Sequence, residues 1–154
     1  MPPPRAILVE PDHDYASRLV NSARSVGWDT VVHDTFAEAR QALTKATPDV
    51  LVSNIRLGAF NGIQLAYLTR ASAPGAGIIL YSPIDDHVLV REARNAGAFY
   101  EPMAFAPYAL PAYLTARLPV GDRRQSVSDD RRRSFRGGRR STDIAALRGA
   151  AYSA

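Results

Sequence analysis

Three short segments of the sequence are apolar at every position, and they limit the fold more than any other feature. They are Ala6-Ile7-Leu8-Val9, Val50-Leu51-Val52 and Ile78-Ile79-Leu80. A strand with one face in water alternates apolar and polar residues, whereas a strand covered on both faces is apolar throughout. We therefore predict buried parallel strands at these three places.

Helical patterns lie between the apolar runs. In the first of these helical patterns, apolar residues recur at spacings of three and four, which gives a helix one apolar face. These residues are Ala16, Leu19, Val20, Ala23 and Val26. The segment Thr35-Phe36-Ala37-Glu38 matches a capping box. We expect Asp14 to be the N-cap of the first helix, Asp85 and Asp86 to favour the start of a later one, and Gly97 to end it.

The patterns alternate strictly along the chain. They predict strands at 6–10, 29–33, 49–53, 77–81 and 98–101 and helices at 14–26, 35–46, 62–72, 85–96 and 108–118. This alternation predicts an α/β fold, a parallel sheet with helices on both faces. Ligands of such sheets bind beyond the carboxyl ends of the strands, so residues 10–12, 54–58 and 82–83 are expected to converge.

The last helix contains two prolines, Pro107 and Pro111. Proline fits only the first turn of a helix without disturbing it. We expect this helix to start at or after Pro107, with Pro111 either in its first turn or at a kink.

Charge divides the chain near residue 120. Residues 1–120 contain ten basic and eleven acidic side chains, whereas residues 121–154 contain nine arginines and four aspartates. We predict a folded domain over 1–120 and an arginine-rich tail over 121–154 that is disordered or ordered by a partner. Candidate partner contacts in the tail are Phe135 and the arginines Arg131, Arg132 and Arg133. Two interpretations of the tail stay open: binding of a nucleic acid or an acidic protein, and a solubilising extension.

The sequence has no cysteine, which excludes disulfides, thiolate metal sites and a cysteine nucleophile. Its apolar runs are far shorter than a membrane span, and no signal peptide is evident. We expect a cytoplasmic protein without membrane contact.

The ordered set of motifs resembles the receiver domain of response regulators over roughly residues 5–118. The first strand ends in Glu10-Pro11-Asp12, where that family carries an acidic pair. Ser53-Asn54 stands at the family's phosphorylation site, and Asn61-Gly62-Ile63 matches its loop into the third helix. Tyr81-Ser82-Pro83 holds the hydroxyl residue that closes the fourth strand. The resemblance implies a flavodoxin-like five-stranded sheet of order 2-1-3-4-5.

The resemblance also implies chemistry that this chain cannot complete. Receivers transfer a phosphoryl group to an aspartate, with Mg²⁺ on the acidic pair and a lysine on the phosphoryl oxygens. Asn54 stands at the position of the aspartate, and Pro11 replaces the second acidic residue, although Asp12 follows it. Met103, or Ala104 in an ungapped alignment, stands where the lysine belongs.

Other family parts are retained. Ser82 keeps the hydroxyl, and Tyr100 stands at the switch aromatic of the fifth strand. We therefore expect a degenerate pseudo-receiver without enzymatic activity, cofactor or metal, which signals through a protein partner in a two-component or phosphorelay pathway. Tyr108 and Tyr113 are the candidate partner or homodimer contacts on the output face. Three alternatives stay open: a regulator that binds nucleic acid or an acidic partner through its tail, a receiver phosphorylated at another residue, and weak binding of a divalent ion by Glu10 and Asp12.

Overall fold

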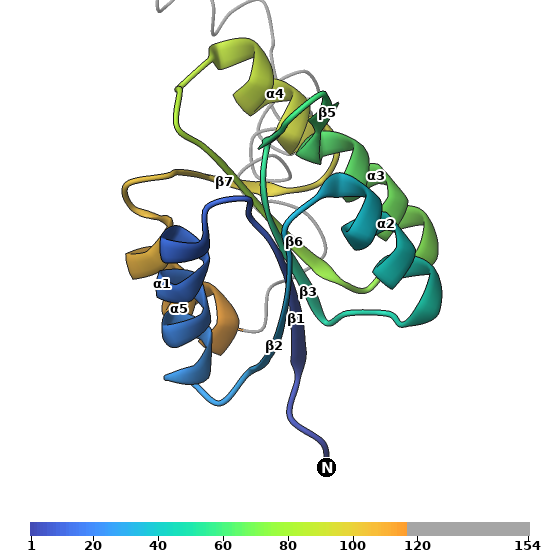
Figure 1. Cartoon of the computed structure of the whole chain (residues 1–154), viewed down its shortest axis with the longest axis vertical. Helices are drawn as coiled ribbons and strands as arrows, with labels where there is room; N and C mark the ends of the chain where they lie inside the picture. Colours follow the sequence, from blue (N-terminus) through green and yellow to red (C-terminus); the bar gives the residue numbers. More distant parts are fainter. Residues whose placement is uncertain (117–154) are drawn as a thin grey trace, which may run out of the picture. The chain divides into compact units, whose positions relative to one another are not determined.

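The protein is represented by a computed structural model that describes residues 1–116. The central sheet of this part (Figure 1) contains β1 (Arg5–Val9), β2 (Asp29–His33), β3 (Val50–Asn54), β6 (Gly77–Ser82) and β7 (Phe99–Pro102). The helices between and after these strands are α1 (His13–Arg24), α2 (Phe36–Lys45), α3 (Gly62–Ser72), α4 (His87–Asn95) and α5 (Ala106–Thr115). A hairpin of β4 (Arg56–Leu57) and β5 (Phe60–Asn61) follows β3. Within residues 1–116, no helix has the length and apolar composition needed to cross a membrane.

The central sheet has the order β2-β1-β3-β6-β7, and all its neighbouring strands are parallel. Because β4 and β5 pair only with each other, β6 and β7 are the fourth and fifth strands of the central sheet. The predicted order 2-1-3-4-5 is therefore confirmed. The predicted bounds of strands and helices differ from the observed ones by up to three residues.

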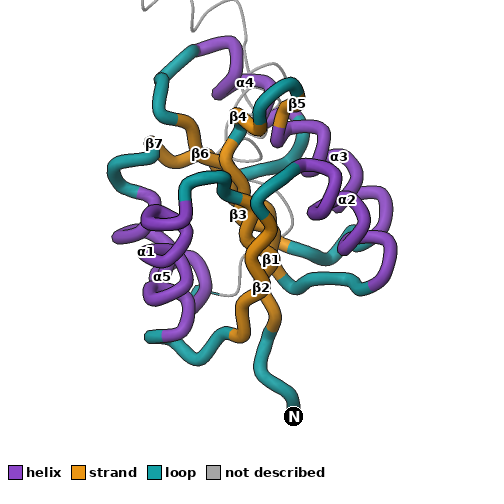
Figure 2. Tube along the Cα trace, viewed as in Figure 1, coloured by secondary structure: helices purple, strands orange, loops and turns teal. Residues whose placement is uncertain are grey.

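Helices cover both faces of the sheet, as Figures 1 and 2 show. Helices α1 and α5 lie on one face and contact each other, whereas α2, α3 and α4 cover the other. Every residue of β3 and β6 is buried, as the continuous apolar runs predict. Each face has its own hydrophobic cluster; that under α1 and α5 includes Tyr15, Leu19, Tyr81, Leu110 and Leu114.

The predicted N-cap of α1 is wrong. Asp12, not Asp14, caps this helix, because its backbone is extended and its Oδ1 accepts from the N–H groups of Asp14 and Tyr15, at 2.9 and 3.1 Å. Asp14 instead lies in the first turn, where its charge favours the helix dipole.

The predicted cap at the start of α2 and the predicted end of α4 agree with the structure, whereas α4 begins at His87 and leaves Asp85 outside the helix. Thr35 Oγ1 accepts from the N–H of Glu38 at 3.2 Å, and the Glu38 carboxylate reaches back to the N–H of Asp34 at 3.3 Å. The side chain of Asp86 caps α4. Gly97 follows the end of α4 with φ +82°, a conformation that glycine adopts without strain.

Helix α5 contains both prolines. It begins at Ala106, two residues before the predicted bound, so the expected start at or after Pro107 is wrong, and Pro107 falls in its first turn. Pro111 lies inside the helix and has no N–H to donate to the carbonyl of residue 107. The Ser22 hydroxyl of α1 donates to that carbonyl oxygen instead, at 2.7 Å. The bond joins the two helices that share this face.

The β4–β5 hairpin has no counterpart among the predicted elements. Its turn contains Gly58 with φ +64°, and its Phe60 ring stacks on Phe36 of α2 with centroids 4.7 Å apart. At the start of α3, a Cβ on Gly62 would lie 2.2 Å from the carbonyl oxygen of Asn54. Only glycine lets the chain return this closely to the end of β3.

We expect Ser22→Ala to lower the free energy of unfolding by about 1 kcal/mol, because it removes the donor to the Pro107 carbonyl. In a Pro111→Ala background the restored N–H at position 111 can satisfy that carbonyl, so Ser22→Ala should cost less. Urea unfolding of the four proteins measures this coupling. Equal losses in both backgrounds would contradict the compensation.

Candidate functional site

Three neighbouring strands bring three polar side chains together at one edge of the sheet. Val9 pairs with Ser53, so Glu10, the next residue after β1, lies beside Asn54 at the end of β3. Asn54 pairs in turn with Tyr81 of β6. Because side chains alternate between the faces of a strand, the register assigns all three to the face covered by α1 and α5.

The carboxylate of Glu10 is the centre of this group. Glu10 is only 2% exposed. Its Oε1 accepts from the N–H of Asp12 at 3.0 Å, and its Oε2 accepts from Nδ2 of Asn54 at 3.1 Å and from the hydroxyl of Tyr81. A buried charge is costly unless it is hydrogen-bonded, and three protein donors satisfy this one.

Both polar atoms of the Asn54 side chain form hydrogen bonds within the protein. Nδ2 donates to Glu10, and Oδ1 accepts from the N–H of Arg56 at 2.9 Å. The side chain is 6% exposed. An aspartate at this position could still accept from Arg56 but could donate nothing to Glu10.

Two tyrosines of the cluster under α1 and α5 pack against each other near Glu10. The rings of Tyr15 and Tyr81 have centroids 5.2 Å apart. Burial, followed by the nearby charge of Glu10, raises the pKa of Tyr81 well above its ordinary value, and the same two causes raise the pKa of Tyr15. Both phenols therefore stay neutral donors: Tyr81 donates to Glu10, and Tyr15 donates to the carbonyl oxygen of Met103.

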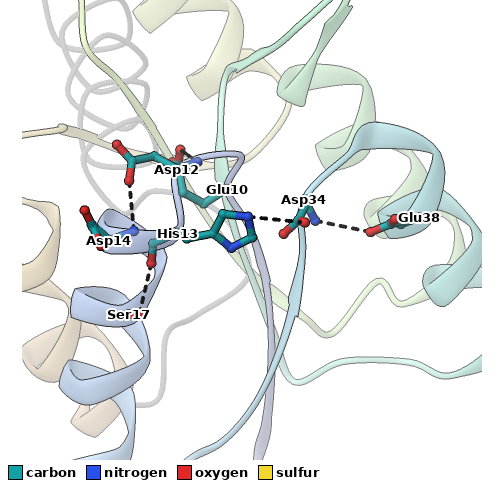
Figure 3. Close-up of polar contacts among 7 residues, drawn as sticks. All are labelled: Glu10, Asp12, His13, Asp14, Ser17, Asp34 and Glu38. Carbon is teal, nitrogen blue, oxygen red and sulfur yellow. Dashed lines mark hydrogen bonds and ion pairs between the residues drawn. The ribbon is translucent and has the colours of Figure 1, made fainter.

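The residues present do not fit the Mg²⁺ that the resemblance implies. Pro11 offers no side-chain ligand, both oxygens of Glu10 already accept hydrogen bonds, and Oδ1 of Asp12 caps α1 (Figure 3). Mg²⁺ demands six oxygen ligands in near-octahedral geometry. Among residues 1–116, no group of three or more histidine, aspartate or glutamate side chains is placed to hold a metal ion.

Figure 3 also shows what surrounds the start of α1. Nε2 of His13 lies 3.7 Å from Oδ2 of Asp34, and both side chains are largely exposed. An exposed pair of this kind contributes little to stability. The contact joins the start of α1 to the end of β2 and does not extend the Glu10 group.

The resemblance assigns the hydroxyl to Ser82 and the position of the lysine to Met103 or Ala104. Ser82 is buried, and its Oγ accepts from the N–H of Ile84 at 3.3 Å. The N–H of Met103 donates to the carbonyl of Ser82 at 3.2 Å, which holds the two loops together. The Met103 side chain packs against the apolar cluster that contains Tyr15 and Tyr81, so it adds to the core and brings no charge to this edge.

Tyr100, the predicted switch aromatic, contacts the loop before α4. Its ring packs against the cluster under α2, α3 and α4, and its hydroxyl donates to Oδ1 of Asp85 at 2.9 Å. Burial and this hydrogen bond raise the pKa of Tyr100 to about 12.

The candidate partner residues lie apart from the Glu10 group. Tyr108 on α5 is 76% exposed. Tyr113 is half-buried, contacts Phe99 with ring centroids 5.4 Å apart, and donates its hydroxyl to Glu101. The tail candidates lie outside the described residues, as does the predicted boundary at residue 120; they are Phe135, Arg131, Arg132 and Arg133.

The sequence prediction missed the two tyrosines of the site. Tyr81 interrupts the otherwise aliphatic run of β6, which was the available signal for a buried hydroxyl with a specific acceptor. Its acceptor, Glu10, is 71 residues away, so only the strand register identifies the pair. Tyr15 gives no such signal, because an aromatic residue on the apolar face of a helix is ordinary core.

Known proteins resemble this chain in sequence. The DNA-binding response regulator MtrA of Mycobacterium tuberculosis is 30% identical over 119 residues, which are 77% of this chain and 52% of MtrA. The transcriptional regulatory protein PrrA of the same organism is 26% identical over 106 residues, 67% of this chain and 46% of PrrA. No protein-family model matches the chain.

Solved structures share the fold. A CheY-like receiver domain protein from Methanospirillum hungatei superposes with a TM-score of 0.69 at 17% identity, over 75% of this chain and 93% of that one. The chemotaxis protein CheY4 of Vibrio cholerae gives 0.67 at 17% identity, over 75% and 99%. The fold of this chain is therefore that of receiver domains, and its sequence resembles those of response regulators. The chain spans about half the length of the two regulators it matches.

We expect Asn54→Asp to destabilise the receiver domain by roughly 1–3 kcal/mol, because it removes a buried hydrogen bond to Glu10 and sets two carboxylates against each other. Proton uptake relieves this repulsion, so the loss in melting temperature should be larger at pH 8 than at pH 5. Thermal unfolding at both pH values measures it. Asn21→Asp, on the exposed side of α1, is the matched control and should change little. A loss independent of pH would contradict the proximity of the charges.

Proposed function

We propose that this receiver domain is a pseudo-receiver, a binding module that signals by protein–protein contact without accepting a phosphoryl group. The observation that carries the proposal is the hydrogen bond from Asn54 to Glu10. The side chain at the phosphorylation position is a neutral amide whose two polar atoms are already bonded inside the protein.

The requirements of phosphoryl transfer support this proposal. Transfer of a phosphoryl group to a side chain needs a nucleophile, and it needs positively charged groups that contact the phosphoryl oxygens. Asn54 has no carboxylate, Met103 has no charge, and the Glu10 group does not fit Mg²⁺. Three separate parts are changed, so restoring one of them does not restore the chemistry.

An uncharged surface on α5 supports contact with a protein partner. The helix Ala106–Thr115 carries no charged side chain. Tyr108 is 76% exposed, and Phe105 just before the helix is 61% exposed. Large exposed aromatic side chains are typical anchors of protein interfaces. Tyr113 is less suited to this role than the sequence suggests, because its hydroxyl is bonded to Glu101 and its ring packs on Phe99.

A second candidate function rests on the charge of residues 121–154. They carry nine arginines, and MtrA is described as DNA-binding. In this alternative, the chain associates with nucleic acid or an acidic partner through its tail. A gel shift of the full chain at increasing salt distinguishes the two functions, since binding that neutralises phosphates weakens steeply with salt.

Incubation of the full chain with acetyl phosphate and Mg²⁺ should leave its intact mass unchanged. Asn54→Asp alone should restore little labelling, because Pro11 and Met103 remain. Mass spectrometry measures both, with a phosphorylatable receiver domain in parallel as positive control. A stoichiometric acid-labile adduct on the unmodified protein would refute the pseudo-receiver, and an adduct mapped elsewhere would favour phosphorylation at another residue.

Tyr108→Asp should abolish capture of protein partners, or self-association, while the domain stays folded, because it sets a charge in an uncharged exposed surface. Pull-down and size-exclusion measurements on the full chain test this. Tyr67→Asp on α3 is the matched control, since Tyr67 is also exposed but lies on another helix. If both variants behave as the unmodified protein does, α5 is not the interaction surface.

A further inference from the structure

The tyrosine beside Glu10 suggests why the acidic site of this domain does not fit a cation. We propose that the Tyr81 hydroxyl acts as a built-in occupant of that site, taking up the Glu10 oxygen that a divalent cation would need. The inference rests on the proposed function, which it deepens by naming the residue that closes the site.

The first observation is how fully Glu10 is engaged. A carboxylate has about four lone-pair positions, and three protein donors occupy three of them here. Two of those donors, Asn54 and Tyr81, share Oε2. A cation that bound Oε2 would have to displace both donors inside the buried site.

The second observation is that packing and strand pairing hold the Tyr81 side chain beside Glu10. It is fully buried and packs in the cluster beneath α1 and α5, against the ring of Tyr15. Its backbone pairs with Asn54 on one side and with Glu101 of β7 on the other. If the phenol turned away from Glu10, its hydroxyl would stay buried and would lose this partner. The strand register therefore holds the hydroxyl against the carboxylate.

The hydrogen bonds of Glu10 also hold three segments of the domain in one arrangement. The loop Pro11–Asp12, the end of β3 and the end of β6 all meet at Glu10 through bonds within the protein. Asn54 and Tyr81 join these segments without a cation or a phosphoryl group. The domain keeps one arrangement at this edge whether or not Mg²⁺ or a phosphodonor is present.

The test restores the acidic residues and then removes the hydroxyl. Pro11→Asp with Asn54→Asp supplies the missing carboxylates, and isothermal titration calorimetry of the full chain measures its affinity for Mg²⁺. Adding Tyr81→Phe to this double variant should tighten Mg²⁺ binding at least tenfold, because Oε2 of Glu10 is then free. Equal affinities with and without Tyr81→Phe, or no binding by either variant, would overturn the proposal.

Tyr15→Phe in the same double variant is the matched control. It deletes a neighbouring buried hydroxyl that donates to Met103 and not to Glu10, so Mg²⁺ affinity should not rise. A rise equal to that of Tyr81→Phe would show that general loosening of the core, not release of Glu10, admits the cation. Circular dichroism establishes that each variant is folded.

A measurement on the unmodified full chain avoids dependence on variants that fail to fold. Proton NMR should show a slowly exchanging Tyr81 hydroxyl proton with a nuclear Overhauser effect to the side-chain amide of Asn54. Absence of that proton would overturn the proposal. Neither measurement depends on phosphorylation, so labelling by acetyl phosphate could refute the pseudo-receiver while leaving the role of Tyr81 intact.

Discussion

The buried carboxylate of Glu10 is the constraint around which the functional edge of this domain is arranged. An ionised carboxylate inside a protein must be compensated by donors or cations. In this chain the donors come from three separate segments: the N–H of Asp12, the amide of Asn54 and the phenol of Tyr81. Satisfying one charge therefore fixes the first loop and the ends of β3 and β6 relative to one another.

The same fold can hold very different chemistry at this edge. The order β2-β1-β3-β6-β7 and the two helical layers are those of a receiver domain, and the chain resembles regulators whose names state DNA binding or transcriptional regulation. Function depends on the side chains presented there rather than on the fold. In this chain the edge carries a neutral amide at position 54 and an apolar side chain at position 103 within the same architecture.

Side chains of α1 form hydrogen bonds to two backbone carbonyls in and before α5. Met103, which carries one of these carbonyls, packs against the cluster of Tyr15 and Tyr81. Tyr15 in turn donates to the Met103 carbonyl. On the same face, Ser22 supplies the donor that Pro111 removes from α5. In both places a partly buried backbone carbonyl accepts a hydrogen bond from a side chain of α1, in keeping with the cost of leaving buried polar groups unpaired.

The sequence by itself determined the five strands of the central sheet, the order of the helices and the cap at Thr35, because these depend on residue type and short spacings. It misplaced the cap of α1, since Asp12 and Asp14 are equally suited to it and only the backbone conformation after β1 selects Asp12. It gave no sign of the β4–β5 hairpin, whose strands are two residues long. The pairing of Tyr81 with Glu10 and of Ser22 with Pro107 was decided by tertiary structure alone, because the partners are 71 and 85 residues apart and meet only through strand register and helix packing.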